Sequence, residues 1–304
     1  MMGMGTVVIG GGSGFIGKAL SKILRAKGYG VVIVSRKPGP FSMTWSELSD
    51  KGLPENSTAV ISLAGQNVLD PTRRWTPGFK QNVWSSRVHS TRSLAEAIKK
   101  LQTPPKVFAS ISGVGFYKPS ETEEYTEYSA GGNHDFLSRL CKDWEEAGEL
   151  PNNINTRRVV VRSGVVLGRQ GGMIQQIFLP FYFGLGGPIG TGNQFMPWIH
   201  IQDIAGIFLH AIENEVKGIL NGVAPEIITN REFTKAFAAE LRRPALIPLP
   251  VKVLNMAFSP ERAIMMTEGQ KVIPQRTLEM GYKYIFPDIR SACKEFAHLI
   301  YKKK

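Results

Sequence analysis

The chain has 304 residues, of which 42% are hydrophobic and 20% are charged. This length and composition exclude a disordered chain and suit one or two globular domains. The net charge of +12 is spread along the chain, apart from a terminal YKKK that we expect to be a solvated tail, and because no nucleic-acid-binding motif accompanies the charge we expect no nucleic-acid partner.

Short β-branched runs alternate with helical patterns through the first 165 residues. This alternation predicts an α/β fold, in which a parallel sheet carries helices on both of its faces. The expected strands are 6–9, 31–34, 59–65, 106–112 and 157–164, and the expected helices are 17–27, 83–99 and 137–148.

The character of the sequence changes near residue 165. Gly and Pro become frequent between 168 and 200, which predicts long loops and a smaller second region beside the sheet. Within it, IFLPFYFGL (177–185) is too short to span a membrane, and we expect a buried segment or the wall of a pocket. Residues 203–222 resume a helix and a strand that we expect to rejoin the main sheet, and another helix is expected from about 229.

A glycine-rich turn lies between the first strand and the first helix, in GGGSGFIG (10–17). Gly11, Gly14 and Gly17 suit a tight turn, a close approach of the backbone to a pyrophosphate and close packing of helix on strand. Phe15 and Ile16 stand at the helix N-terminus, where free N–H groups face phosphates. The turn therefore predicts a dinucleotide site, and the alternative is a purely structural strand-to-helix turn.

The tip of the second strand carries Ser35, Arg36 and Lys37. A site that prefers NAD usually holds an acidic residue here, about twenty residues after the glycines, to bind the ribose hydroxyls. Arg36 instead suits a bidentate pair with a 2′-phosphate, and Ser35 adds a hydrogen-bond donor. We therefore predict NADP(H) rather than NAD(H), the alternative being ordinary surface charges.

Small residues follow a later strand, in SLAG (62–65), where they would let a cofactor lie against the backbone; a structural turn is the competing interpretation. With these motifs in view, the chain resembles the extended, epimerase-like branch of the short-chain dehydrogenase/reductase superfamily, and more narrowly its atypical epimerase-family subfamily U. The resemblance covers nearly the whole chain and rests on GGGSGFIG (10–17), VSRKPG (34–39), SLAGQNV (62–68), RRW (73–75), SRVHST (86–91), VVVRSGVVLG (159–168), GGPIGTGNQFMPWIHIQDIAG (186–206), LNGVAPEIITNREF (220–233) and GQKVIPQRTLEMGY (269–282).

The resemblance implies a Rossmann-type, doubly wound parallel sheet with a small C-terminal substrate region. It implies that residues 1–165 bind NADP(H) and that 166–304 mainly bind substrate, with 203–222 returning to the sheet. It also implies cofactor contacts at Leu63, Ala64, Asn82, Arg87 and Val166. Arg87 is physically apt because a cation beside an anionic cofactor is favourable. Val166 fits the nicotinamide end, and simple core packing is its alternative.

The family's catalytic pattern is broken. Extended members normally use Ser with Tyr-x-x-x-Lys, whose spacing places Tyr and Lys on one helix face. No tyrosine of this chain has a lysine four residues later, and alignment of the helix on Glu145 places Leu137 and Cys141 at the two positions. Gly113 stands at the Ser position. The catalytic residues are therefore unknown.

Three side chains are conceivable substitutes, and each has a structural alternative. Tyr117 suits a half-buried aromatic, Lys142 points away from the Cys141 position and suits a solvated charge, and His200 suits a structural histidine paired with Asp203. A cleft between the sheet edge and 170–304 would suit the substrate. Core packing explains its candidate aromatics equally well; these are Phe181, Tyr182, Phe195 and Trp198.

The sequence thus predicts an NADP(H)-dependent oxidoreductase or epimerase-like protein that acts on an unknown small molecule. The alternative is a catalytically silent protein that holds NADP(H) as a structural or sensing ligand. Cys141 and Cys293 are the only cysteines and are far apart, and the histidines are scattered, so we expect neither a disulfide nor a metal site. With no signal or membrane segment evident, we expect no membrane partner and an intracellular, most simply cytoplasmic, location, with a mitochondrial one left open.

Overall fold

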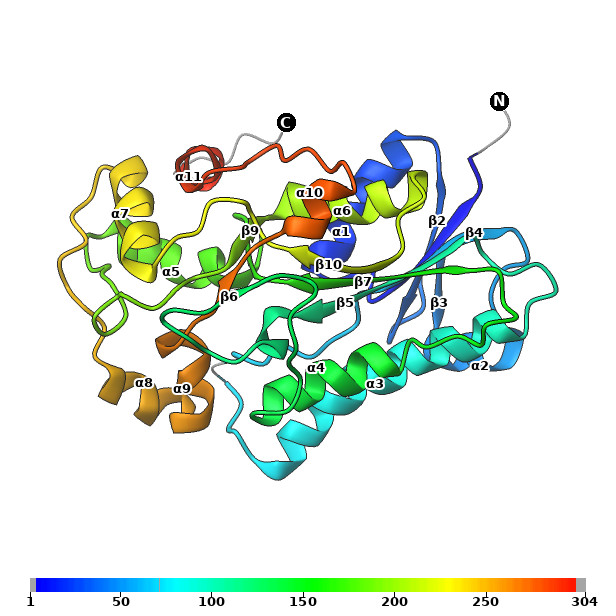
Figure 1. Cartoon of the computed structure of the whole chain (residues 1–304), viewed down its shortest axis with the longest axis horizontal. Coiled ribbons are helices and arrows are strands. Elements are labelled where there is room, and N and C mark those ends of the chain that lie inside the picture. The colour runs from blue at the N-terminus through cyan, green and yellow to red at the C-terminus, as the bar shows by residue number, and fades with distance from the viewer. Residues whose placement is uncertain (1–3, 71, 299–304) are drawn as a thin grey trace.

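The computed structural model describes residues 4–70 and 72–298, so the terminal YKKK lies outside the described residues. Seven strands form the central sheet: β1 (Thr6–Gly10), β2 (Gly30–Ser35), β3 (Ser42–Thr44), β4 (Ser57–Ser62), β5 (Val107–Gly113), β7 (Arg157–Ser163) and β10 (Gly218–Gly222). Their order is β10-β7-β5-β4-β1-β2-β3, and every neighbouring pair is parallel (Figure 1). The predicted doubly wound α/β sheet is confirmed.

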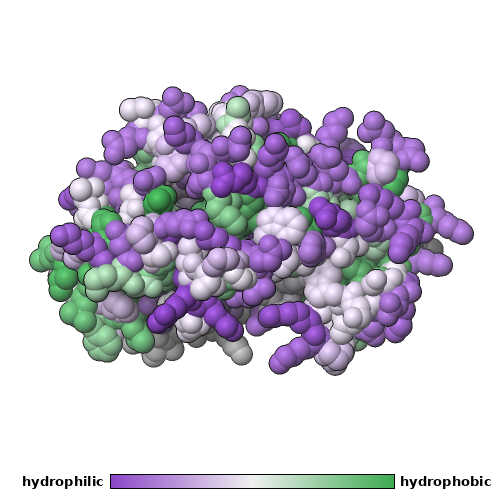
Figure 2. Space-filling view, turned by 90° about the horizontal axis from the view of Figure 1, so that it is seen from below, coloured by the Kyte–Doolittle hydropathy of each residue, from purple (hydrophilic) through white to green (hydrophobic). Residues whose placement is uncertain are grey.

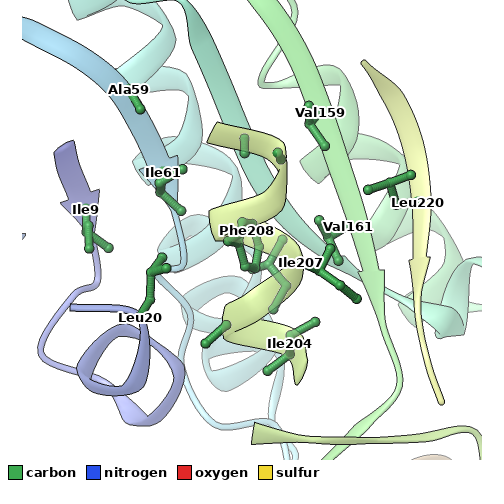
Figure 3. Packing of buried hydrophobic residues seen from close by; sticks show 14 of the residues in the cluster. Ile9, Leu20, Ala59, Ile61, Val159, Val161, Ile204, Ile207, Phe208 and Leu220 are labelled. Carbon is green, nitrogen blue, oxygen red and sulfur yellow. The ribbon is translucent and has the colours of Figure 1, made fainter. Parts of the chain in front are cut away.

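Helices cover both faces of this sheet (Figure 1). On one face lie α1 (Phe15–Ala26) and α6 (Ile201–Glu213), and on the other lie α2 (Trp45–Lys51), α3 (Pro77–Lys99) and α4 (Phe136–Glu146). The alternation of side chains along a strand decides which face each residue serves. Figure 3 shows Ile9 and Ile61 of the sheet on the face that Leu20 of α1 and Phe208 of α6 cover. Val8, between two such positions, packs with α2 and α3 instead.

A second hydrophobic core lies in the C-terminal half. It joins α5 (Gly172–Tyr182), β9 (Trp198–His200), α7 (Asn230–Leu241) and α11 (Ile289–Phe296). The remaining elements are short: η1 (Val114–Phe116), β6 (Glu124–Tyr125), β8 (Val165–Leu167), α8 (Val251–Phe258), α9 (Pro260–Thr267), β11 (Lys271–Val272) and α10 (Gln275–Glu279). Two small parallel sheets, β8-β9 and β11-β6, connect this half to the carboxyl edge of the main sheet.

The Gly- and Pro-rich stretch departs from the sequence prediction. Instead of loops alone it contains α5, with Pro180 inside the helix two residues before its end. The expectation for IFLPFYFGL is half right. Phe178 and Phe181 are buried in the second core, but Leu179 is exposed because only one face of the helix meets that core. Phe183 and Leu185, which follow the helix, are exposed as well.

Candidate functional site

The glycine turn connects β1 to α1. Gly11 has a φ of +76°, and a Cβ added there would lie 2.7 Å from both the Cα and the amide nitrogen of Ala64. At Gly17 a Cβ would lie 2.5 Å from the Cα of Gly12. The absence of side chains therefore lets the turn pack directly on backbone.

The N-terminus of α1 is free of side-chain caps. Gly14 is its N-cap residue and offers no side-chain acceptor, and the first turn holds no acidic residue. Phe15, Ile16 and Gly17 are the first three residues of the helix, so their N–H groups have no partner within it. Together with the positive end of the helix dipole, these N–H groups suit an anion such as a pyrophosphate.

The end of β2 lies beside this turn, because the Gly11 N–H donates to the carbonyl oxygen of Val34 over 2.8 Å. Ser35 is the last residue of β2, and its hydroxyl donates to the carbonyl oxygen of Lys37 over 2.7 Å. Arg36 and Lys37 are exposed, and within the described ranges neither forms an ion pair. Two cations are therefore available within reach of a phosphate at this corner.

Leu63 and Ala64 follow β4 and form the other wall of the glycine turn. The Leu63 N–H donates to the carbonyl oxygen of Gly10 over 2.8 Å, and both residues are half-buried. The backbone of 63–64 therefore borders the N-terminus of α1.

Arg87 of α3 reaches the same sheet edge. Its Nη1 donates to the carbonyl oxygen of Val83 over 3.1 Å, and its Cζ lies 5.1 Å from the centroid of the Trp144 ring. A Cβ on Gly65 would lie 3.1 Å from that Cζ, so the guanidinium rests on the backbone just after β4. Burial lowers the pKa of Arg87 to about 10, which leaves it charged at neutral pH. No carboxylate pairs with it in 4–70 or 72–298, so it is a half-buried cation suited to an anionic ligand.

Asn82 lies on α3, one turn before Ser86, whose hydroxyl accepts a hydrogen bond from the Gln66 N–H over 2.9 Å. The side chain of Asn82 is exposed. The helix face that carries Asn82 and Ser86 thus borders the segment that follows β4, while Arg87 stands next to it around the helix.

Val166 lies in β8, beyond the carboxyl end of β7, and pairs with Ile199 of β9. The loop that follows meets the glycine turn through Phe15: a Cβ at Gly168 would lie 2.9 Å, and one at Gly171 would lie 2.6 Å, from atoms of the Phe15 ring. Sequence analysis missed this contact. The sequence signal was GRQGG (168–172), whose glycines let the backbone of this loop approach another part of the chain closely.

The three altered catalytic positions come together at the carboxyl end of β5. A Cβ on Gly113 would lie 3.5 Å from the Cys141 Sγ, and one on Gly115 would lie 3.7 Å from the Leu137 Cβ. Burial, and then the nearby Glu145 carboxylate, raise the pKa of the Cys141 thiol to about 11. Gly113 and Leu137 have no titratable side chain. None of the three is thus fitted to exchange a proton near neutral pH.

We expect Cys141 to alkylate slowly in the folded protein. With a pKa of about 11, only roughly a thousandth of the thiol is thiolate at pH 8, and the thiol is buried. Mass spectrometry after iodoacetamide treatment should find Cys141 mostly unlabelled in the native protein and labelled in urea. Rapid native labelling at pH 8 would show that the thiol is open and activated.

Tyr117 is buried in a polar network rather than facing a cleft. Its hydroxyl donates to Asn221 Oδ1 over 2.8 Å and accepts from Arg162 Nη1 over 3.0 Å, and burial raises its pKa. Arg162 is itself held by Glu145 through two 2.8 Å contacts. Burial opposes the charge of Arg162, but the bonds to Glu145 outweigh it and raise the pKa of the guanidinium. The network ties α4 to β7 and serves structure.

The other two substitutes also have structural roles. Lys142 is exposed and pairs with Glu146 at 3.9 Å. His200 is buried and caps α6, its Nδ1 accepting from the Gln202 N–H, so its Nε2 carries the proton toward Glu295 Oε2 at 3.1 Å. The predicted pairing of His200 with Asp203 is wrong. Asp203 instead accepts hydrogen bonds from the hydroxyl of Tyr282 and from backbone N–H groups of 285–286.

Of the four candidate cleft aromatics, Phe181 and Trp198 are buried in the second core, whereas Tyr182 and Phe195 are half-buried. Core packing therefore accounts for the first two. Within the described chain, no three His, Cys, Asp or Glu side chains gather as a metal site would require. None of the described helices combines the length and apolar character needed to cross a membrane.

Comparison with known proteins matches most of the chain to one family. The model of the NAD dependent epimerase/dehydratase family matches residues 7–222, and that of a domain of unknown function matches 249–296. The human epimerase family protein SDR39U1 is 54% identical over 290 residues, which cover 95% of this chain and 98% of that protein. The epimerase family protein YfhF of Bacillus subtilis is 33% identical over 298 residues, covering 95% and 97%.

A solved structure extends the comparison to three dimensions. The crystal structure of human SDR39U1 (isoform 2) with NADPH superposes with a TM-score of 0.95 at 54% identity. The superposition covers 97% of this chain and all of that one.

Proposed function

The chain belongs to the NAD dependent epimerase/dehydratase family, and from this we propose that it binds NADP(H) and acts as an oxidoreductase or epimerase-like protein on a small molecule. The observation that carries the proposal is the uncapped N-terminus of α1, set between the backbone of Ala64 and the two exposed cations that follow β2. The human relative that was crystallised with NADPH supports the same cofactor here.

The residues present fit such a dinucleotide, because the first turn of α1 offers N–H groups without a partner in the helix and Gly11 carries no Cβ that would push the turn away from the backbone of Ala64. The N–H groups of Phe15, Ile16 and Gly17 would hold the pyrophosphate. Ser35 and Arg36 would hold the 2′-phosphate, and the backbone of Leu63 and Ala64 would border the adenosine half. We assign Asn82, Arg87 and Val166 to the nicotinamide half, beside Gly113, Leu137 and Cys141.

Bound there, the nicotinamide would supply a hydride donor or acceptor. The protein's contribution is orientation and charge. Arg87 places a half-buried cation at the sheet edge, and the loop against Phe15 connects the second region to the glycine turn. We propose that residues 1–165, with 203–222, form the nucleotide-binding part and that the rest of 166–304 binds the substrate.

Replacing Arg36 by Asp should weaken NADPH binding by about a hundredfold and leave NADH binding nearly unchanged. A charge-assisted pair contributes about 1.5–3 kcal/mol, and the new carboxylate also repels the 2′-phosphate. Calorimetric titration of both nucleotides measures the effect, with Lys100→Asp, at the end of α3, as a matched change of charge. Equal losses of affinity for NADPH and NADH would show that the 2′-phosphate does not bind at Arg36.

The second candidate is a silent NADP(H)-binding protein with a structural or sensing role. It is favoured by one observation, namely that Gly113 and Leu137 have no titratable side chain and that the pKa of the Cys141 thiol is raised to about 11, far from neutral. Incubation of the purified protein with NADPH and a mixture of carbonyl metabolites and sugar nucleotides separates the two functions. The enzyme should oxidise NADPH or convert a metabolite, whereas tight binding without turnover on any of them would favour the silent protein.

A further inference from the structure

An exposed apolar surface lies at one end of the C-terminal half. All eight residues from Leu246 to Val253 are exposed, and only Lys252 among them is charged. The side chains of Leu246 and Met256 are 83% and 86% exposed, values typical of charged surface residues rather than large apolar ones. We call the exposed apolar side chains of 183–185 and 246–256 the end patch.

The two segments of the end patch are neighbours. The Ile247 N–H donates to the carbonyl oxygen of Gly186 over 3.3 Å, and the Leu249 N–H donates to that of Pro188 over 2.9 Å. Phe183 and Leu185, 69% and 62% exposed, therefore lie next to the run that begins at Leu246. Figure 2 shows apolar side chains gathered at the left of the molecule, the end at which Figure 1 places α8. A continuous apolar surface of this kind marks an interaction site.

The end patch is anchored to the rest of the protein through α8. Leu254 of α8 is buried, which fixes the helix to the protein, while Val253 and Met256 on other sides of the helix point outward. Pro248 and Pro250 restrict the chain before the helix. The apolar side chains are thus displayed at little conformational cost to whatever covers them.

The segments 183–185 and 246–256 contain one charged residue, Lys252, and Arg242 and Arg243 stand shortly before the second segment. Between 241 and 260 the only charged residues are Arg242, Arg243 and Lys252, and 183–199 contains none. All three cations are exposed, and within the described residues none forms an ion pair. The Nε of Arg243 donates to the carbonyl oxygen of Tyr182 over 2.7 Å, which holds this cation beside the apolar side chains. Apolar side chains among these cations complement a surface that is negative outside and apolar beneath.

We propose that the end patch docks on an anionic lipid surface, with its apolar side chains in the headgroup region and Arg242, Arg243 and Lys252 against lipid phosphates or carboxylates. A second copy of the chain fits less well. In a two-fold interface the same patch meets itself, which would bring the three cations of each copy together without a carboxylate from either patch. Docking of this kind requires no spanning helix. It is thus compatible with a sequence in which no membrane segment is evident, the ground on which we expected no membrane partner.

Flotation of the purified full chain with lipid vesicles tests the proposal. The protein should float with phosphatidylcholine vesicles that contain phosphatidylserine, less so as salt is added, and at least about tenfold less with phosphatidylcholine alone. The variant Leu246→Ser/Met256→Ser should partition at least about tenfold more weakly. Arg242→Gln/Lys252→Gln should lose about thirtyfold, since each cation near an anionic bilayer contributes roughly fivefold.

Ile285→Ser is the matched control. Ile285 is 59% exposed and lies between α10 and α11, which Figure 1 draws at the opposite edge from α8, so this variant should float like the wild type. A near-native thermal transition for each variant shows that it is folded. Failure of the wild type to float, or unchanged flotation of Leu246→Ser/Met256→Ser, would overturn the proposal. So would a wild-type dimer in sedimentation that this double variant dissociates, because the end patch would then bind a second copy.

Discussion

Replacing Arg162 by Met lowers the free energy of unfolding by about 3–5 kcal/mol. The side chain of Arg162 is 3% exposed, and that of its partner Glu145 is 11% exposed. Met preserves much of the volume but leaves the Glu145 carboxylate without its main counter-charge in a place that water hardly reaches. Tyr117 also loses the donor to its hydroxyl. Urea denaturation followed by circular dichroism measures the loss.

The double variant Glu145→Leu/Arg162→Met separates the pair from its surroundings. It removes both charges together, so it should recover at least half of the stability that Arg162→Met loses. A single variant within about 0.5 kcal/mol of the wild type would show that the ion pair does not hold α4 to β7.

The Gly11→Ala variant should lose NADPH affinity by at least about a hundredfold, or about 2.8 kcal/mol. The added Cβ would lie 2.7 Å from the Ala64 backbone in a residue with a φ of +76°, so either the turn moves or 63–64 does. Both borders of the proposed pyrophosphate site would shift. Fluorescence titration with NADPH measures the effect.

Gly28→Ala provides the control for strain alone. Gly28 has a φ of +91°, but nothing lies within 4 Å of a Cβ added there. Both substitutions should destabilise the fold through φ, whereas only Gly11→Ala should impair binding. Equal NADPH affinity for Gly11→Ala and the wild type would place the cofactor away from this turn.

The main sheet was predictable because its signals are local. Apolar strands followed by glycine turns and helical periodicity located β1, α1, β2, β4, β5 and β7 to within a few residues, apart from the earlier start of α3 at Pro77. The short α2 was missed, although Thr44 and Glu47 form a capping box that the sequence spells. The start of α7 was predicted correctly, since the helix expected from about 229 begins just after Thr229.

Long-range pairings could not be predicted from the same signals. His200 was expected to pair with the adjacent Asp203, yet its partner is Glu295, 95 residues away. The partner depends on how α11 packs on the second core, which no local pattern encodes. Likewise, only the packing of α8 shows that the apolar run from Leu246 faces outward.

The candidate site divides in the same way. Motifs at strand ends located Gly11, Arg36 and Leu63, because in a parallel sheet every carboxyl end meets at one edge. That the Arg87 guanidinium would lie on the backbone of Gly65 could not be predicted from a local pattern, because the two residues belong to different elements. The altered positions Gly113, Leu137 and Cys141 also lie at that edge. Because none of them is fitted to exchange a proton near neutral pH, the residues at this edge support a cofactor and do not indicate a reaction.

We propose above all that the uncapped first turn of α1 and the cations after β2 hold NADP(H). The most direct test is calorimetric titration of the purified chain with NADPH and, separately, with NADH. We predict one site per chain and an NADPH affinity about tenfold to a hundredfold above that for NADH, since a charged hydrogen bond to the 2′-phosphate contributes about 1.5–3 kcal/mol. Equal affinities, or no binding of either nucleotide, would contradict the claim.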